Sequence, residues 1–163
     1  MAEGNVHHAE RDGTVVIRFL GDIRYTIAPA LDRFLDALFA RQDLKTIIVD
    51  LSDAESIDST GLGLLARIAN FLRRRDGSRP LLFSSQPDIN AVLSSICLDT
   101  AFIHCAQRPD LAADSVLAAG NPSEKEVAQT VLDAHRLLSE MNDTNRAQFQ
   151  DVVEAFEREL GKS

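Results

Sequence analysis

The sequence predicts a mixed α/β domain followed by a separate helical segment, and three observations support this prediction. Its 163 residues suit one domain of ordinary size. Hydrophobic residues make up 45% of the chain and charged residues 26%, which is the usage of a folded protein with a buried core. Apolar runs alternate with helical repeats over residues 5–119, whereas residues 123–163 contain no strand-like run. We therefore divide the chain at the turn-forming sequence Gly120-Asn121-Pro122.

Five short apolar runs are expected to be strands. The run that follows Gly13 is rich in β-branched residues, and the dipeptide Asp12-Gly13 predicts a tight hairpin with the segment before it. The run that ends at Leu51 is apolar almost throughout, which is typical of a central parallel strand buried on both faces. The expected strands are residues 5–10, 13–20, 45–51, 80–84 and 101–105.

Four further segments repeat apolar residues every three or four positions, as amphipathic helices do. The second of them carries three arginines at its end and a glycine at position 77, both of which favour a helix C-terminus. The resulting order, ββαβαβαβα, predicts a mixed sheet with helices packed mainly on one face. The expected helices are residues 29–41, 58–76, 89–98 and 110–119.

Residues 123–163 are expected to form a helical hairpin. Ser123 and Glu126 have the spacing of a capping box, and an apolar stripe follows them. A break at Asn142-Asp143 precedes a second stripe that includes Phe149 and Phe156. Short helices are marginal alone, so both stripes need a surface. That surface is the first 120 residues, a partner, or a second copy of the chain in a homodimer.

Composition excludes several classes of function. The net charge of −8 repels phosphate backbones, so we expect no direct binding of nucleic acid. No apolar run is long enough to span a bilayer, and no signal peptide is recognisable, so we expect a cytoplasmic protein without membrane insertion. Cys97 and Cys105 match neither a disulfide framework nor a zinc motif, and we interpret them as buried thiols.

The most informative stretch joins the central strand to the second helix through Asp58-Ser59-Thr60. Free backbone N–H groups at a helix N-terminus donate hydrogen bonds to a capping side chain, and the positive end of the helix dipole favours a phosphate at the same place. The position alone therefore permits two roles for Ser59. It is a helix cap or a site of phosphorylation.

The motif Asp58-Ser-Thr-Gly-Leu-Gly63, which follows Ile47-Ile-Val-Asp-Leu51, resembles the STAS domain of bacterial anti-sigma factor antagonists. The resemblance covers residues 5–119 and leaves residues 123–163 outside it. It implies a STAS-like fold and phosphorylation of Ser59, with Thr60 as a minor alternative. The residues it implies at the partner surface are Asp58, Ser59, Thr60, Gly61 and Leu62.

The resemblance also implies the partners. A serine kinase with a histidine-kinase-like ATPase domain, which is also the anti-sigma factor, binds the unmodified protein and is released by phosphorylation at Ser59. A phosphatase of the PP2C type, in some cases fused to a response regulator, resets the switch. On this interpretation the chain is not an enzyme, because it has no catalytic residues, cofactor or metal site of its own.

Arg24 is a departure from the family pattern, because many members have an acidic residue there. We add it to the expected partner surface, since an arginine near Ser59 can pair with a phosphate or with an acidic partner. Two alternative functions stay open. The module can signal to a client other than a sigma-factor inhibitor, such as a biofilm, motility or second-messenger regulator, or it can be an accessory subunit of a membrane transport system.

Overall fold

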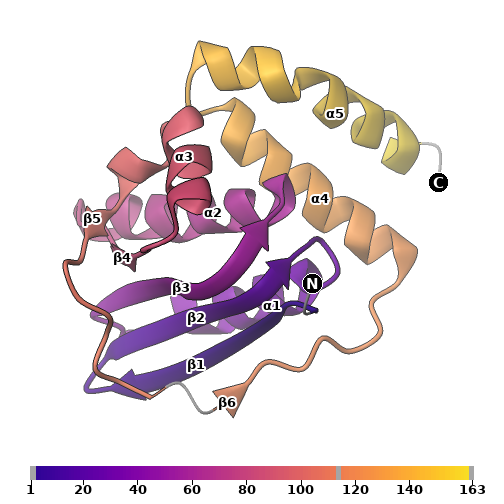
Figure 1. Cartoon of the computed structure of the whole chain (residues 1–163). Coiled ribbons are helices and arrows are strands. Elements are labelled where there is room, and N and C mark those ends of the chain that lie inside the picture. Colours follow the sequence, from indigo (N-terminus) through magenta and orange to yellow (C-terminus); the bar gives the residue numbers. More distant parts are fainter. Residues whose placement is uncertain (1–2, 113–114, 162–163) are drawn as a thin grey trace.

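A computed structural model describes residues 3–112 and 115–161, and within them the strands form one mixed sheet (Figure 1). The strand order is β5-β4-β3-β2-β1-β6. The neighbours β2, β3, β4 and β5 are parallel, whereas β1 is antiparallel to both β2 and β6. The strands are β1 (Asn5–Arg11), β2 (Thr14–Ile23), β3 (Thr46–Ile57), β4 (Leu81–Phe83), β5 (Ile103–His104) and β6 (Ser115–Val116).

The predicted hairpin between β1 and β2 is confirmed, and its turn has the geometry that the sequence indicated. Asp12 and Gly13 have φ angles of 50° and 86°. Positive φ at both central residues is the type I′ arrangement, whose twist matches that of paired strands. The carbonyl of Gly13 also accepts a hydrogen bond of 2.8 Å from the backbone N–H of Lys45, so the turn is tied to the start of β3.

The helices alternate with the strands in the predicted order as far as β5. Helix α2 ends at Gly77, which has a φ of 76°, and its last turn carries the three expected arginines. The fold class predicted from the sequence is therefore confirmed. The helices are α1 (Ala28–Phe39), α2 (Ser59–Asp76), α3 (Pro87–Ser95), α4 (Glu124–Ser139) and α5 (Asp143–Gly161), with a short 3₁₀ turn at Asp99–Ala101.

One apolar core joins the sheet to the helices. Alternate residues of β2 and β3 share this core with buried residues of α1, α2 and α3, as expected for a sheet whose helices lie mainly on one face. The other face of β3 presents Asp50, which pairs with Arg18 of β2. The β2 and β3 residues in the core are Val15, Ile17, Phe19, Ile23, Ile47, Val49, Leu51 and Ala54.

The structure corrects the prediction of a helix at residues 110–119. Ser115 and Val116 instead form β6, which pairs with His8 and His7 of β1. The backbone N–H of Leu117 then donates a 2.8 Å hydrogen bond to the carbonyl of Val6. An edge strand offers unpaired backbone groups, and these override the weak helical pattern of the segment. Residues 113 and 114 lie outside the described part of the chain.

Two smaller expectations also change. The predicted strand at residues 101–105 is shortened to β5, because a 3₁₀ turn precedes it. Neither cysteine is the buried thiol that we expected: Cys97 is exposed and Cys105 is half-buried. Cys97 has a φ of 61° in the turn that follows α3, a conformation to which its apolar neighbours in sequence gave no clue.

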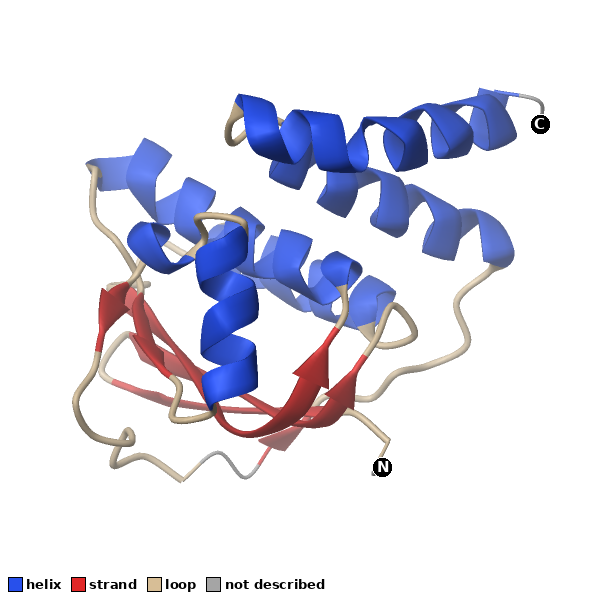
Figure 2. Cartoon of the chain, turned by 45° about the horizontal axis from the view of Figure 1, so that its top comes forward, coloured by secondary structure: helices blue, strands red, loops and turns tan. Residues whose placement is uncertain are grey.

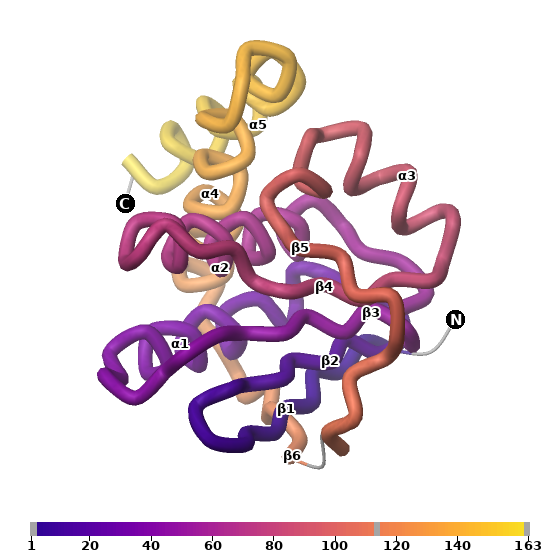
Figure 3. Tube along the Cα trace, turned by 90° about the vertical axis from the view of Figure 1, so that its left-hand side faces the viewer, coloured from indigo at the N-terminus to yellow at the C-terminus, as the bar shows by residue number. Residues whose placement is uncertain are grey.

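The predicted helical hairpin exists and is docked on the domain. Helix α4 packs on α2, and α5 packs on the outer side of α4, so that Figures 1 and 2 show α5 as the outermost layer. Figure 3 shows the hairpin above α2, at the opposite end of the molecule from β1 and β6. Leu138 and Phe149 belong to the same core as the sheet. The apolar stripe of α4 therefore faces the chain's own first 120 residues.

Candidate functional site

Asp58 organises the start of α2. It is the N-cap residue of the helix, and its Oδ1 accepts a 2.9 Å hydrogen bond from the backbone N–H of Gly61. Its Oδ2 accepts a 2.8 Å hydrogen bond from the backbone N–H of Tyr25, in the loop between β2 and α1. One carboxylate thus satisfies a free donor of the helix and holds the neighbouring loop against it. Because Asp58 is the cap, the hydroxyl of Ser59 is available for another role.

That hydroxyl contacts a histidine of the C-terminal hairpin. The Oγ of Ser59 lies 2.8 Å from Nε2 of His135 on α4. The Nδ1 atom of the same ring lies 2.7 Å from the carbonyl oxygen of Val131. A carbonyl oxygen can only accept, so Nδ1 carries a proton. In the tautomer with its proton on Nδ1, Nε2 is the acceptor for the hydroxyl of Ser59.

His135 is held in place from several sides. Only 4% of its surface is exposed, which is unusual for a histidine. The ring of Phe149 on α5 meets it edge to face, with 5.7 Å between the ring centres. The bond to Val131 fixes the ring orientation as well as the tautomer. The acceptor for the Ser59 proton is therefore a rigid part of the hairpin.

A cavity of about 610 Å³ opens beside Ser59. Residues of the domain form one side of it, and apolar residues of both hairpin helices form the other. Ser59 itself is half-buried and reaches this space. The space next to the serine is therefore bounded by two parts of the chain. Its walls include Tyr25, Asp58, Ser59 and Thr60 from the domain and Val127, Val131, Val152 and Phe156 from the hairpin.

The other residues of the expected partner surface occupy different environments. Thr60, Gly61 and Leu62 are buried, and a Cβ on Gly61 would lie 2.8 Å from a side-chain carbon of Ile57. Arg24 is exposed, and its guanidinium lies 5.9 Å from the ring centre of Tyr25, which lines the cavity. The structure thus brings Asp58, Ser59 and Thr60 to one cavity and places Arg24 at its margin.

Sequence reasoning missed His135. Its position was a usable signal, because it lies four residues after Val131 and three before Leu138, on the apolar face of α4. A polar residue on a buried face needs a hydrogen-bond partner. Which partner it finds depends on how α4 docks, and the sequence does not encode that contact locally.

Asp50 on β3 is a fully buried carboxylate, and its role is structural. Its Oδ2 lies 2.8 Å from Nε of Arg18 and 3.5 Å from Nε of Arg108. Burial raises the pKa of Asp50, but hydrogen bonds from Ser52 and Arg18 outweigh that effect and hold the pKa below its usual value of 3.8. It is therefore an ionised, fully paired group. Among the described residues, no group of three or more histidine, cysteine, aspartate or glutamate side chains is arranged to hold a metal ion.

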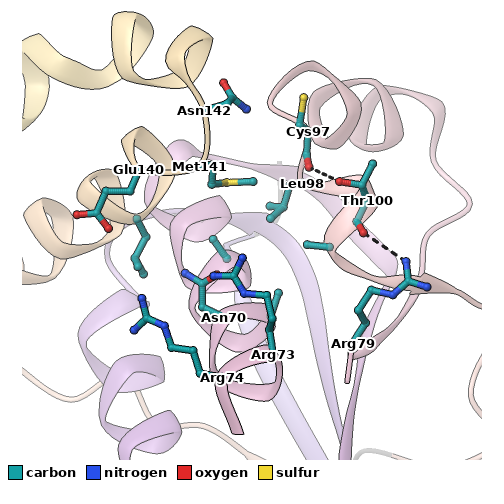
Figure 4. A pocket seen from close by; sticks show the side chains of 14 residues that line it. Asn70, Arg73, Arg74, Arg79, Cys97, Leu98, Thr100, Glu140, Met141 and Asn142 are labelled. Carbon is teal, nitrogen blue, oxygen red and sulfur yellow. Dashed lines mark hydrogen bonds between the residues drawn. The ribbon is translucent and has the colours of Figure 1, made fainter. Parts of the chain in front are cut away.

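A second cavity, of about 510 Å³, lies at the other end of α2 beneath the turn of the hairpin (Figure 4). Arg73, Arg74 and Arg79 line it, and within residues 3–112 and 115–161 none of them forms an ion pair. Arg73 donates a hydrogen bond of 3.1 Å to the side chain of Asn70, and Arg79 donates one of 3.4 Å to the carbonyl of Thr100. Other arginines of this cluster form ion pairs or donate to the backbone of neighbouring elements. Arg67 pairs with Asp32 and Asp36 of α1, and Arg75 donates to the carbonyls of Leu44 and Lys45. The arginines of this cluster therefore contact neighbouring elements, in addition to favouring the C-terminus of α2 as the sequence predicted.

Among known protein families, the STAS domain matches residues 5–109 of this chain. The chain belongs to the STAS family. No curated protein sequence matches it. Among solved structures, the anti-sigma factor antagonist SpoIIAA in its unphosphorylated form has a TM-score of 0.56 at 20% identity, covering 63% of this chain and 89% of the other.

The phosphorylated form of SpoIIAA, described as a Bacillus cell fate determinant, has a TM-score of 0.53 at 19% identity. It covers 63% of this chain and 92% of its own. This likeness establishes a common fold. The STAS match ends at residue 109, so the hairpin with His135 lies outside it. Among the described residues, no helix is both long enough and apolar enough to cross a bilayer.

Proposed function

We propose that this STAS protein is an anti-sigma factor antagonist that acts by partner switching, with Ser59 as the switch. The observation that carries the proposal is the place of Ser59. It is the first residue of α2, directly after the Asp58 cap, and its hydroxyl is not needed to cap the helix. The structures of SpoIIAA, an antagonist known in phosphorylated and unphosphorylated forms, support the same assignment.

The physical chemistry of the position favours a phosphate. The group adds about 1.5–2 negative charges and three acceptor oxygens, and a helix N-terminus stabilises negative charge. Phosphorylation is therefore expected to leave α2 folded and to change what binds at its start. Thr60 is the weaker candidate, because it is 3% exposed. We include Arg24, which is exposed and lies beside Tyr25, in the partner surface, because an arginine can pair with an acidic group of a partner.

The partners in this proposal are proteins. A serine kinase with a histidine-kinase-like ATPase domain, which is also the anti-sigma factor, binds the unmodified protein, and a PP2C-type phosphatase restores it. The chain itself performs no catalysis and needs no cofactor. Its surface around Asp58, Ser59 and Arg24 is recognised by the kinase.

The test is phosphopeptide mapping of the protein recovered from its native cells, together with identification of the proteins that purify with it. We expect phosphate on Ser59 and a kinase of the stated class in the eluate. Ser59→Ala should abolish the phosphate and retain the kinase, whereas Thr60→Ser, the matched conservative change next to it, should leave both unchanged. Absence of phosphate on Ser59 under all growth conditions would refute the switch.

The identity of the retained protein separates the proposal from its alternatives. A regulator that is not a sigma-factor inhibitor would assign the module to another signalling client. A permease would make it an accessory subunit of a transport system, and Arg73, Arg74 and Arg79, which line the cavity beneath the hairpin turn, would then be the first surface to mutate.

A further inference from the structure

We propose that the C-terminal hairpin covers the partner-binding end of α2, and that docking of the hairpin and phosphorylation of Ser59 exclude each other. The proposal rests on the proposed function in one respect, namely that Ser59 is the modified residue. The occupant of the surface is the chain's own α4 and α5. A protein partner therefore competes with the hairpin for the same end of α2.

The first argument is the space at Ser59. Its Oγ is at hydrogen-bond distance, 2.8 Å, from Nε2 of His135. A phosphate attached to Oγ places a phosphorus atom and three more oxygens in the volume that His135 borders. The ring cannot turn away alone, because it is bonded to Val131 and packed by Phe149.

The second argument is the seam between α2 and α4. A Cβ built on Gly63 would lie 2.5 Å from both the Cβ and the carbonyl oxygen of Ala134. The backbones of the two helices are therefore in direct contact one turn from Ser59. Helix α4 cannot move closer to α2, so a larger group at Ser59 has to displace α4.

The third argument is access for a kinase. Transfer of a phosphoryl group requires the hydroxyl to lie about 3–3.5 Å from the reacting phosphorus. A specific protein complex typically buries about 800 Å² on each partner. Ser59 is half-buried, and residues of α4 and α5 form one side of the cavity of about 610 Å³ beside it. The hairpin therefore occupies part of the surface that a kinase needs around Ser59, and its displacement favours phosphorylation.

The packing of the hairpin shows which end can move. Near its turn, Leu138 and Phe149 are in the core, and the side-chain amide of Asn145 donates to the carbonyl of Ile96 at 2.9 Å. Near Ser59, Val131 and His135 of α4 are buried, whereas Val152 and Phe156 of α5 are only half-buried. The α5 layer over Ser59 is therefore the less tightly packed part of the hairpin, and we expect opening to begin there, with the turn as the pivot.

Binding energies are reciprocal, so the two events disfavour each other in both directions. A docked hairpin slows phosphorylation of Ser59, and a phosphate on Ser59 loosens the hairpin. The protein is then a switch with two inputs, because any factor that stabilises the docked hairpin also holds Ser59 unmodified.

The experiment is hydrogen exchange of the full chain with phosphoserine installed at position 59 during translation, so no kinase is needed. We expect the amides of residues 124–135 to exchange about tenfold faster or more in the phosphoserine protein than in the Ser59 protein, with β2 and β3 unchanged. A second variant, Ala134→Glu, drives the hairpin off α2 without a phosphate. It should show the same loss of protection, and its matched control, Ala155→Glu on the exposed face of α5, should not.

Equal protection of residues 124–135 in the phosphoserine and Ser59 proteins would overturn the inference. Increased protection would overturn it too, since it would mean that the phosphate holds the hairpin on α2. If Ala134→Glu unfolds the whole domain, the phosphoserine protein alone decides. A failure of the proposed function looks different: Ser59 carries no phosphate in native cells, whatever the hairpin does.

Discussion

The two ends of the C-terminal hairpin are packed in different ways. The anchored end, around Leu138, Asn145 and Phe149, is buried in the core of the domain. At the opposite end, which we call the overhanging end, Val152 and Phe156 of α5 are half-buried and line the cavity beside Ser59. One pair of helices thus contributes stability at one end and a movable cover at the other. The difference teaches that an appended segment can be integral to a fold and still leave part of itself free to move.

The largest expected contrast is between two phenylalanines of α5. Phe149→Ala removes a buried ring from the anchored end and should lower the free energy of unfolding by about 3–5 kcal/mol. Phe156→Ala removes the same group from the overhanging end and should cost about 1 kcal/mol or less, because its ring is already half-exposed. Urea unfolding of both variants measures the difference. Equal losses would show that the two ends are packed alike.

A second contrast concerns two glycines. Gly63→Ala places a methyl group against Ala134 and should destabilise the fold by about 1–3 kcal/mol, because α4 has to shift. Gly161→Ala adds the same methyl at the end of α5, where nothing lies within 4 Å, and should change stability by about 0.5 kcal/mol at most. Thermal unfolding compares the pair. If Gly63→Ala were neutral, the seam would be looser than the structure indicates.

The hydrogen bond between Ser59 and His135 should have a smaller, measurable energy. A double-mutant cycle of Ser59→Ala and His135→Ala should give a coupling of about 0.5–1.5 kcal/mol, the usual range for one buried hydrogen bond. The helix cap is unaffected, since Asp58 provides it. Denaturant unfolding of the four proteins supplies the cycle. A coupling of zero would mean that the two side chains do not hold each other in solution.

The smallest effect is expected from the ion pair between the two helices. Nη2 of Arg136 lies 3.2 Å from Oε1 of Glu157, and both side chains are partly exposed. Arg136→Ala should lower stability by about 0.2–1 kcal/mol, and the loss should shrink in high salt. Arg146→Ala is the control, because Arg146 has no ion pair among the described residues. A salt-independent loss would point to packing of the Arg136 stem instead of its charge.

Features that depend on short stretches of chain could be predicted from the sequence. The dipeptide Asp12-Gly13 predicts the hairpin turn, and Asp58-Ser59-Thr60 predicts the start of α2. The break predicted at Asn142-Asp143 is found at residues 140–142, between the two hairpin helices. The prediction of a helix failed for residues 110–119, because Ser115 and Val116 pair as a strand with the edge of β1. A long-range contact outweighed a weak local pattern there.

The sequence by itself determined the order of strands and helices up to residue 105, the start of α2 within Asp58-Ser59-Thr60, and the presence of a helical hairpin after the domain, because periodicity and caps act between residues a few positions apart. Only the tertiary structure decided which surface the hairpin covers. Ser59 and His135 are 76 positions apart, and no local pattern relates them. They meet because two small residues, Gly63 and Ala134, let α4 approach α2 closely enough for a serine hydroxyl to reach an imidazole.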